Sequence, residues 1–283
     1  MQTPKGKIVA IGGHEDKGSV PMPLQPERRE KIHFFHDGIL KRIHDELHGQ
    51  GTRIEVITSA SLIPEEMGKA YFDAFLRLGC DNVGALHIRS RQEADYPETL
   101  ARLAKADGIM FSGGDQNRIA AIFQNTAALK LLRKRYLEEE KFLISGTSAG
   151  AMALSEVMIC GDEFQNSLVK GLVELGKGLG LLENLIIDTH FVNRRRIPRM
   201  IETIAANPQH IGVGLAEDTG ILITKGTYIE TIGSGLVVVM DGRKLKDNNY
   251  PKAAPGELLG LENLVMHVLP RGKTFHVTSG SLF

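Results

Sequence analysis

The chain has few cysteines and no excess of charge of either sign. Cys80 and Cys160 are the only cysteines in 283 residues, and both stand in apolar surroundings. Two cysteines do not provide the framework of a disulfide-stapled secreted domain, so we expect buried free thiols in a reducing compartment. Lys and Arg together number 34, as do Asp and Glu. A broad basic field that would attract nucleic acid is therefore not expected.

Long hydrophobic runs are also missing, and we expect no signal segment. No stretch is long enough to cross a bilayer as a helix, and residues 1–7 lead into a strand-like run without an apolar signal core. The phosphate-binding patterns G-x-G-x-x-G and G-x-x-x-x-G-K-[ST] do not occur. What is present, 42% hydrophobic and 24% charged residues, is typical of a globular protein. We expect a cytoplasmic protein without a membrane partner.

Short apolar runs alternate with amphipathic patterns over the first two thirds of the chain. The runs predict strands at residues 7–12, 53–59, 83–88, 108–113, 142–146 and 185–189. Apolar residues three or four positions apart predict helices at residues 30–47, 64–78, 97–105, 119–140 and 198–206. This alternation indicates an α/β fold in which helices cover both faces of a mostly parallel sheet.

The last quarter of the chain has a different pattern. Short strands are predicted at residues 220–225, 228–232 and 236–240, with Gly-containing turns between them. Residues 264–269 and 274–277 are typical of a final hairpin around Arg271 and Gly272. The sheet should therefore end in antiparallel strands. The Pro-rich stretches 18–26 and 251–256 are expected to be surface loops, so a single domain over residues 1–283 is predicted.

One short run nominates a nucleophile. An apolar segment leads into Gly-Thr-Ser-Ala-Gly at residues 146–150, and a helix-prone stretch follows at 152–158. This is the G-x-S-x-G pattern in the strand–turn–helix context that it requires. A serine on such a turn is exposed, and the N–H groups at the start of the helix point to where an oxyanion would form. Ser148 is therefore the candidate nucleophile.

A serine nucleophile needs a base, a group that orients the base and an oxyanion hole. These should come from the carboxyl ends of other strands. At residues 111–116, Gly113 and Gly114 could expose N–H groups that complete an oxyanion hole with Ala149. Alternatively, this run is a plain turn in which Asp115 caps the next helix. Gln116 could contact substrate or face solvent.

Two more strand ends offer the remaining groups. His190 follows a buried type of strand and precedes Arg194, Arg195, Arg196 and Arg199. Cations are disfavoured at a helix N-terminus, so this cluster indicates an anionic partner. Glu217 or Asp218, at the end of a small-residue strand, could hold the imidazole in the correct tautomer. His14, in the turn after the first strand, is a less favoured alternative base.

Together these motifs resemble those of the cyanophycinases, which belong to the peptidase E-like serine peptidases of family S51. The resemblance rests on Phe111–Gln116, Gly146–Ala151, Asp188–Phe191 with the arginines that follow, and Gly214–Thr219. It extends over nearly the whole chain, from Gly12 and Gly13 to Asp241 and Gly242. Four motifs in this order and spacing are far more specific than G-x-S-x-G alone.

The resemblance implies a three-layer α/β/α sandwich, related to the class I glutamine amidotransferases and usually found as a homodimer. It implies that Ser148 is the nucleophile, His190 the base and Glu217 the third member of the triad, with an oxyanion hole at Gly114 and Ala149. The positions that it assigns to substrate binding are Gln116, Asp188, Thr189, Arg194, Arg196 and Arg199.

The implied substrate is cyanophycin, a poly-aspartate backbone that carries an arginine on each side-chain carboxyl, and the implied product is β-Asp-Arg. Neither a metal nor an organic cofactor is implied. The arginines could grip the substrate's carboxylates, and Asp188, Glu15 or Asp16 could receive its guanidinium groups. Thr189 stands where this family usually has Gln, and Ala216 replaces an acidic residue. A peptidase E-like aspartyl or isoaspartyl dipeptidase and a catalytically silent amidotransferase-like binding protein are the alternatives.

Overall fold

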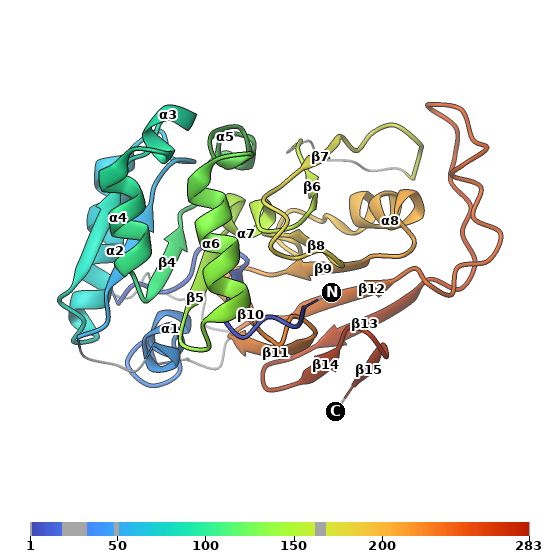
Figure 1. The fold of residues 1–283 in the computed structure, drawn as a ribbon. Coiled ribbons are helices and arrows are strands. Elements are labelled where there is room, and N and C mark those ends of the chain that lie inside the picture. Colours follow the sequence, from blue (N-terminus) through green and yellow to red (C-terminus); the bar gives the residue numbers. More distant parts are fainter. Residues whose placement is uncertain (1, 19–32, 48–50, 162–167, 283) are drawn as a thin grey trace.

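The structure is a computed structural model that describes residues 2–18, 33–47, 51–161 and 168–282 (Figure 1). Its largest sheet has the strand order β15-β14-β11-β10-β1-β5-β4-β2-β3. In chain order these strands are β1 (Lys7–Ile11), β2 (Ile54–Ile57), β3 (Val83–Leu86), β4 (Gly108–Phe111), β5 (Leu143–Thr147), β10 (Thr219–Thr224), β11 (Tyr228–Gly233), β14 (Thr274–His276) and β15 (Ser281–Leu282).

The five strands from β1 to β3 in this order are parallel, and the four from β15 to β10 are antiparallel to their neighbours. In the parallel half, Ile11 on β1 pairs with Thr147 on β5, and Phe111 on β4 pairs with Gly146. The carboxyl ends of β1, β4 and β5 therefore meet at one edge of the sheet. That edge is where a parallel sheet places its functional residues.

Helices cover both faces of this sheet, as the alternating pattern predicts. On β1, the side chains of Ile8 and Ala10 join the core on one face, and those of Val9 and Ile11 join the core on the other. The helices are α1 (Ile39–Glu46), α2 (Pro64–Arg77), α3 (Arg91–Ala94), α4 (Pro97–Lys105), α5 (Gln116–Phe123), α6 (Ala127–Glu138), α7 (Ala149–Ala153) and α8 (Ile197–Ala206). Residues from α4 to α7 belong to the first core, and residues from α1 and α2 to the second. The result is a three-layer α/β/α arrangement.

A second sheet was not anticipated from the sequence. Its order is β13-β12-β9-β8, with β8 (Leu185–Asp188), β9 (Ile211–Leu215), β12 (Val237–Asp241) and β13 (Val265–Leu269). Its own core includes Phe191, Met200 and Ile204, so α8 packs against it (Figure 1). β6 (Val157–Ile159) and β7 (Leu175–Lys177) form a further two-stranded sheet.

The predicted hairpin at the end of the chain is wrong. β13 pairs with β12 in the second sheet, whereas β14 pairs with β11 and β15 in the first. The turn around Arg271 and Gly272 thus carries the chain from one sheet to the other. Its Gly272 adopts a φ of 78°, which suits a sharp change of direction whether or not the two strands pair.

Two of the predicted helices have different bounds. The pattern at residues 119–140 contains two helices, because Asn125 adopts a φ of 64° and Thr126 caps α6 by accepting from Leu129 N–H. The pattern at 30–47 gives α1 only from Ile39, and residues 30–32 lie outside the described part. Among the helices of the described ranges, none combines the length and apolar composition needed to cross a bilayer.

Candidate active site

Ser148 lies on a sharp turn between β5 and α7. Its backbone is in the left-handed region, with φ 50° and ψ −118°, a conformation that costs a non-glycine residue about 1–3 kcal/mol. Both glycines of the motif are sterically required. A Cβ on Gly146 would lie 2.5 Å from the carbonyl carbon of Gly150, and a Cβ on Gly150 would lie 2.3 Å from the carbonyl oxygen of Phe111. The sequence thus forces a close strand–helix approach that leaves the serine side chain partly exposed.

Ser148, His190 and Glu217 form a continuous line of contacts. Ser148 Oγ lies 2.9 Å from His190 Nε2, and His190 Nδ1 lies 2.9 Å from Glu217 Oε1. A neutral imidazole fits this line if Nδ1–H donates to the carboxylate and Nε2 accepts from the serine hydroxyl. His190 follows β8 and is 5% exposed, while Glu217 lies in the turn between β9 and β10. The three side chains therefore come from strand ends in two different sheets.

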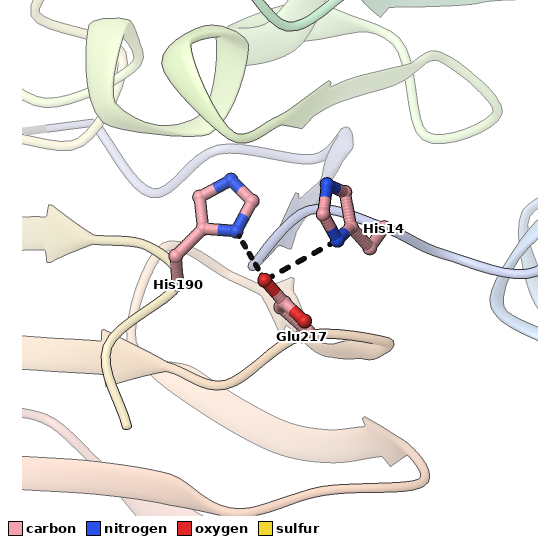
Figure 2. Close-up of side chains that lie close together, drawn as sticks. All are labelled: His14, His190 and Glu217. Atoms are coloured by element: carbon pink, nitrogen blue, oxygen red, sulfur yellow. Dashed lines mark hydrogen bonds and ion pairs between the residues drawn. The ribbon is translucent and has the colours of Figure 1, made fainter. Parts of the chain in front are cut away.

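His14 shares the same carboxylate. Figure 2 shows that His14 and His190 both direct a ring nitrogen to Glu217. His14 Nδ1 is 3.2 Å from Oε1, and the two imidazoles meet edge to face with centroids 5.0 Å apart. The hydroxyl of Ser148 is bonded to His190 rather than to His14, so the geometry favours His190 as the base. The side chain of His14 is 68% exposed.

Asn193 is a site residue that the sequence reasoning missed. Its Nδ2 donates to Glu217 Oε2 at 3.0 Å, so both carboxylate oxygens have partners. Asn193 stands next to the arginine run, and only its position beside a catalytic motif could have drawn attention to it.

The electrostatics favour a neutral imidazole beside an ionised carboxylate. Burial lowers the pKa of His190, the hydrogen bond with Glu217 raises it in part, and the neighbouring Arg194 and His14 lower it. For Glu217, burial raises the pKa, but the His190 hydrogen bond and the nearby His14 outweigh burial and leave the pKa below its usual value. His190 can therefore accept a proton at neutral pH.

A tight turn after β1 brings the two sheets together at this site. A Cβ on Gly13, which has a φ of 98°, would lie 2.5 Å from His190 Cε1. The carbonyl oxygen of Gly12 accepts from His190 N–H at 2.9 Å, and that of Gly13 accepts from Asp218 N–H at 2.8 Å. The backbone of the β1 turn therefore positions both the histidine and the acidic turn.

The expected oxyanion-hole segment lies against Ser148. A Cβ built on Gly113 would lie 3.4 Å from Ser148 Cβ, so Gly113 borders the serine directly. Gly114 has a φ of 140°, and a Cβ there would lie 2.1 Å from the Ala60 carbonyl oxygen. Ala149 is the first residue of α7, where N–H groups have no partner within the helix. Asp115 also caps α5 by accepting from Asn117 N–H, as the alternative interpretation expects.

Most of the expected substrate-binding side chains are buried. Thr189 is 1% exposed and its Oγ1 lies 3.3 Å from Met152 Sδ, while Gln116 is 8% exposed and donates to the Ile159 and Cys160 carbonyl oxygens. Arg194, by contrast, is exposed at the surface beside His190.

Asp188, Arg196 and Arg199 form a buried ionic cluster. Asp188 has no exposed surface, and its carboxylate accepts from Arg199 Nε at 2.7 Å, from Arg199 Nη2 and from Arg196 Nη1 at 3.2 Å. Burial raises the pKa of Asp188, and the Arg199 hydrogen bonds, which lower it, offset that effect only in part. The expectation that Asp188 receives a substrate guanidinium therefore needs correction, because arginines of this chain already occupy its carboxylate.

A buried network around Glu15 supports the turn that carries Ser148. Glu15 accepts from Thr147 Oγ1 at 2.7 Å, from Lys17 Nζ at 2.9 Å and from the Tyr71 hydroxyl. Thr147 is the residue before Ser148. Burial raises the pKa of Glu15, but Lys17 and the hydroxyl donors outweigh burial and lower it overall. Glu15 is 4% exposed, so its expected role as a receiver of substrate guanidinium is also corrected.

Comparison with known proteins identifies related enzymes. A model of "Peptidase family S51" matches residues 32–231. "Cyanophycinase" from Synechococcus elongatus is 36% identical over 273 residues, which cover 96% of this chain and 80% of that protein. "Cyanophycinase" from Trichormus variabilis is 31% identical over 280 residues, which cover 98% of this chain and 88% of that protein.

Solved structures share the fold as well. The crystal structure of a peptidase from an acI-B1 Actinobacterium superposes with a TM-score of 0.64 at 20% identity, over 98% of each chain. Together with the mixed sheet and its two helical layers, this likeness is consistent with the class I glutamine amidotransferase-like fold that the motifs imply.

Proposed function

The chain belongs to peptidase family S51, and from that premise we propose that it is a serine-type exopeptidase that hydrolyses cyanophycin to β-Asp-Arg. The observation that carries the proposal is the line of two 2.9 Å contacts from Ser148 through His190 to Glu217. The cyanophycinases that match nearly all of this chain support the choice of substrate. We further propose that residues 1–283 act as one peptidase domain.

In the proposed mechanism, Ser148 Oγ attacks a backbone carbonyl of the substrate while His190 Nε2 takes the hydroxyl proton. Glu217 stabilises the imidazolium that forms, and N–H groups at Gly114 and Ala149 stabilise the oxyanion. The intermediate collapses, His190 returns its proton to the departing amine, and an acyl-enzyme remains. Water then attacks the ester with His190 again as base, which releases the second product and restores Ser148.

The arginine-rich segment supports an anionic substrate. Each arginine of cyanophycin retains a carboxylate, and an exposed guanidinium can bind a carboxylate through two hydrogen bonds. We propose that Arg194 makes this contact. We propose that the buried residues Gln116, Asp188, Thr189, Arg196 and Arg199 support the substrate site from beneath its surface, and that the Asp188 cluster holds the start of α8 against β8.

Incubation of the purified protein with purified cyanophycin tests the proposal. Mass spectrometry should detect β-Asp-Arg, and Ser148→Ala should lower its rate of formation at least about 10⁴-fold while the fold is retained. Ser279→Ala is a matched control, since it removes another serine hydroxyl from an exposed turn between β14 and β15, outside the site. Hydrolysis of Asp-X dipeptides without β-Asp-Arg formation would instead support a peptidase E-like dipeptidase.

The resemblance also implies a homodimer in the cytoplasm, and we propose both. Light scattering coupled to size-exclusion chromatography would measure the molar mass in solution. A single species of about the 31.0 kDa calculated for one chain would reject the dimer.

A further inference from the structure

Two histidines and a glutamate converge at the rim of the site. His190 Nδ1 lies 2.9 Å from Glu217 Oε1, and His14 Nδ1 lies 3.2 Å from the same oxygen (Figure 2). The ligand atoms that the three side chains offer all lie within 4.8 Å of one another. The proposed reaction uses His190 and Glu217 but has no task for His14.

Two of the three separations are close to those around a tetrahedral metal ion, and the separation between the two imidazole nitrogens stays within the 4.8 Å span. Zn²⁺ binds imidazole nitrogen and carboxylate oxygen at about 2.0–2.2 Å, which puts neighbouring ligand atoms about 3.3 Å apart. The 2.9 and 3.2 Å separations are close to that spacing. Asn193 holds the other carboxylate oxygen, Oε2, and so orients Oε1 between the imidazoles.

We propose that His14, His190 and Glu217 form a Zn²⁺-binding site, and that zinc bound there switches the peptidase off. Three protein ligands would leave the fourth position to water. Two imidazoles and one carboxylate favour a borderline ion such as Zn²⁺ over Mg²⁺, which prefers oxygen ligands. The exposure of the His14 side chain, 68%, provides an entry path from solvent.

Inhibition follows from the tautomer of His190. A metal on Nδ1 needs the lone pair of that nitrogen, so the Nδ1 proton must leave and the neutral ring carries its proton on Nε2 instead. Nε2–H then donates to Ser148 Oγ and cannot accept the hydroxyl proton. The metal also takes Glu217 from its place beside the imidazole. Both changes stop proton transfer from Ser148 to His190.

A site with three side-chain ligands and a fourth position open to solvent should release zinc to a strong chelator, as a reversible switch requires. The inhibition rests on the proposed function, but metal binding by these residues does not.

Binding of Zn²⁺ to the full-length protein can be measured by competition with a chromophoric chelator. His14→Asn is the best variant, because His14 has a φ of 52° and asparagine tolerates that region. We expect one Zn²⁺ per wild-type chain, and we expect His14→Asn to weaken binding at least about tenfold. His36→Asn, the same substitution at another exposed histidine, should bind Zn²⁺ as the wild type does.

Cyanophycin hydrolysis is then followed during Zn²⁺ titration and after addition of EDTA. We expect Zn²⁺ to inhibit the wild type and His36→Asn reversibly. For His14→Asn, the Zn²⁺ concentration that gives half-inhibition should rise by the same factor as its Zn²⁺ affinity falls. Mg²⁺ should not inhibit any of the three proteins. Absence of Zn²⁺ binding, equal affinities of wild type and His14→Asn, or binding without inhibition would each overturn the proposal. If cyanophycin is not hydrolysed at all, the chelator competition still decides the metal site, and the proposed function fails separately.

Discussion

Replacing Asp188 by asparagine should destabilise the fold, because it removes one charge from a buried ionic cluster and leaves the others. Asp188 has no exposed surface, and Arg199 is only 3% exposed. The carboxylate receives two hydrogen bonds from Arg199 and one from Arg196. Arg199 is too deeply buried for bulk solvent to compensate its charge once the carboxylate is lost.

The magnitude follows from these contacts. A hydrogen bond to a charged group contributes about 1.5–3 kcal/mol, and such contributions are not additive here, because the Thr189 N–H also donates to the same carboxylate and four donors share it. Removing one partner of a buried ion pair typically costs about 3–5 kcal/mol. Asparagine keeps one acceptor oxygen, so we expect a loss of about 3 kcal/mol from a total stability of about 5–15 kcal/mol.

Urea unfolding followed by far-ultraviolet circular dichroism measures this loss. The matched control is Asp73→Asn, which breaks the 2.7 Å pair between Lys69 and Asp73 on the surface of α2 and should cost about 1 kcal/mol or less. Asp188→Leu combined with Arg199→Met should recover part of the stability, because apolar replacement of a buried pair is often neutral. A loss for Asp188→Asn no larger than that of the control would refute the reasoning.

Three further predictions concern activity. Because the pKa of His190 is lowered, chiefly by burial, kcat/KM should stay constant down to about pH 6.5 and fall only as pH drops through the lower folded value. The contribution of His190 to the free energy of unfolding should be lost over the same pH window, since the unfolded chain binds the proton at a higher pH than the folded chain. A fall of kcat/KM that begins above pH 6.5 would contradict the assignment of His190 as the base. Arg194→Ala should lower kcat/KM for cyanophycin about 10- to 100-fold but leave a neutral ester unaffected, whereas equal losses on both substrates would indicate a structural role. EDTA should leave the activity of protein prepared without metal unchanged. A loss of activity that a divalent ion restores would show that the proposed reaction needs a metal.

Much of the architecture could be predicted because the parallel strands are short apolar runs that end at turn residues. Local pattern could not show that β8 and β9 leave the main sheet, since strand pairing depends on contacts distant in sequence. The break between α5 and α6 depends on the left-handed backbone of Asn125, which a continuous apolar periodicity conceals.

The candidate site could be predicted residue by residue only where a side chain closely follows the end of a strand. Ser148, His190 and Glu217 all do, and the turn geometry then brings them into contact. The approach of His14 to Glu217 depends on its φ of 52°, and no spacing in the sequence encodes that conformation. The internal pairing of Asp188 with Arg199 depends on how α8 packs, so the same arginines could equally have been expected to face substrate.

The division of the proposed catalytic groups between two sheets has a consequence for inactivation. Ser148 is carried by the nine-stranded sheet, His190 by the four-stranded sheet, and Glu217 by the segment that joins them. A slight slippage between the sheets would lengthen the serine–histidine contact while every strand and helix stays formed. Loss of turnover should therefore precede loss of secondary structure on heating. The activity would then report on the alignment of the two sheets before any spectroscopic measure of secondary structure changes.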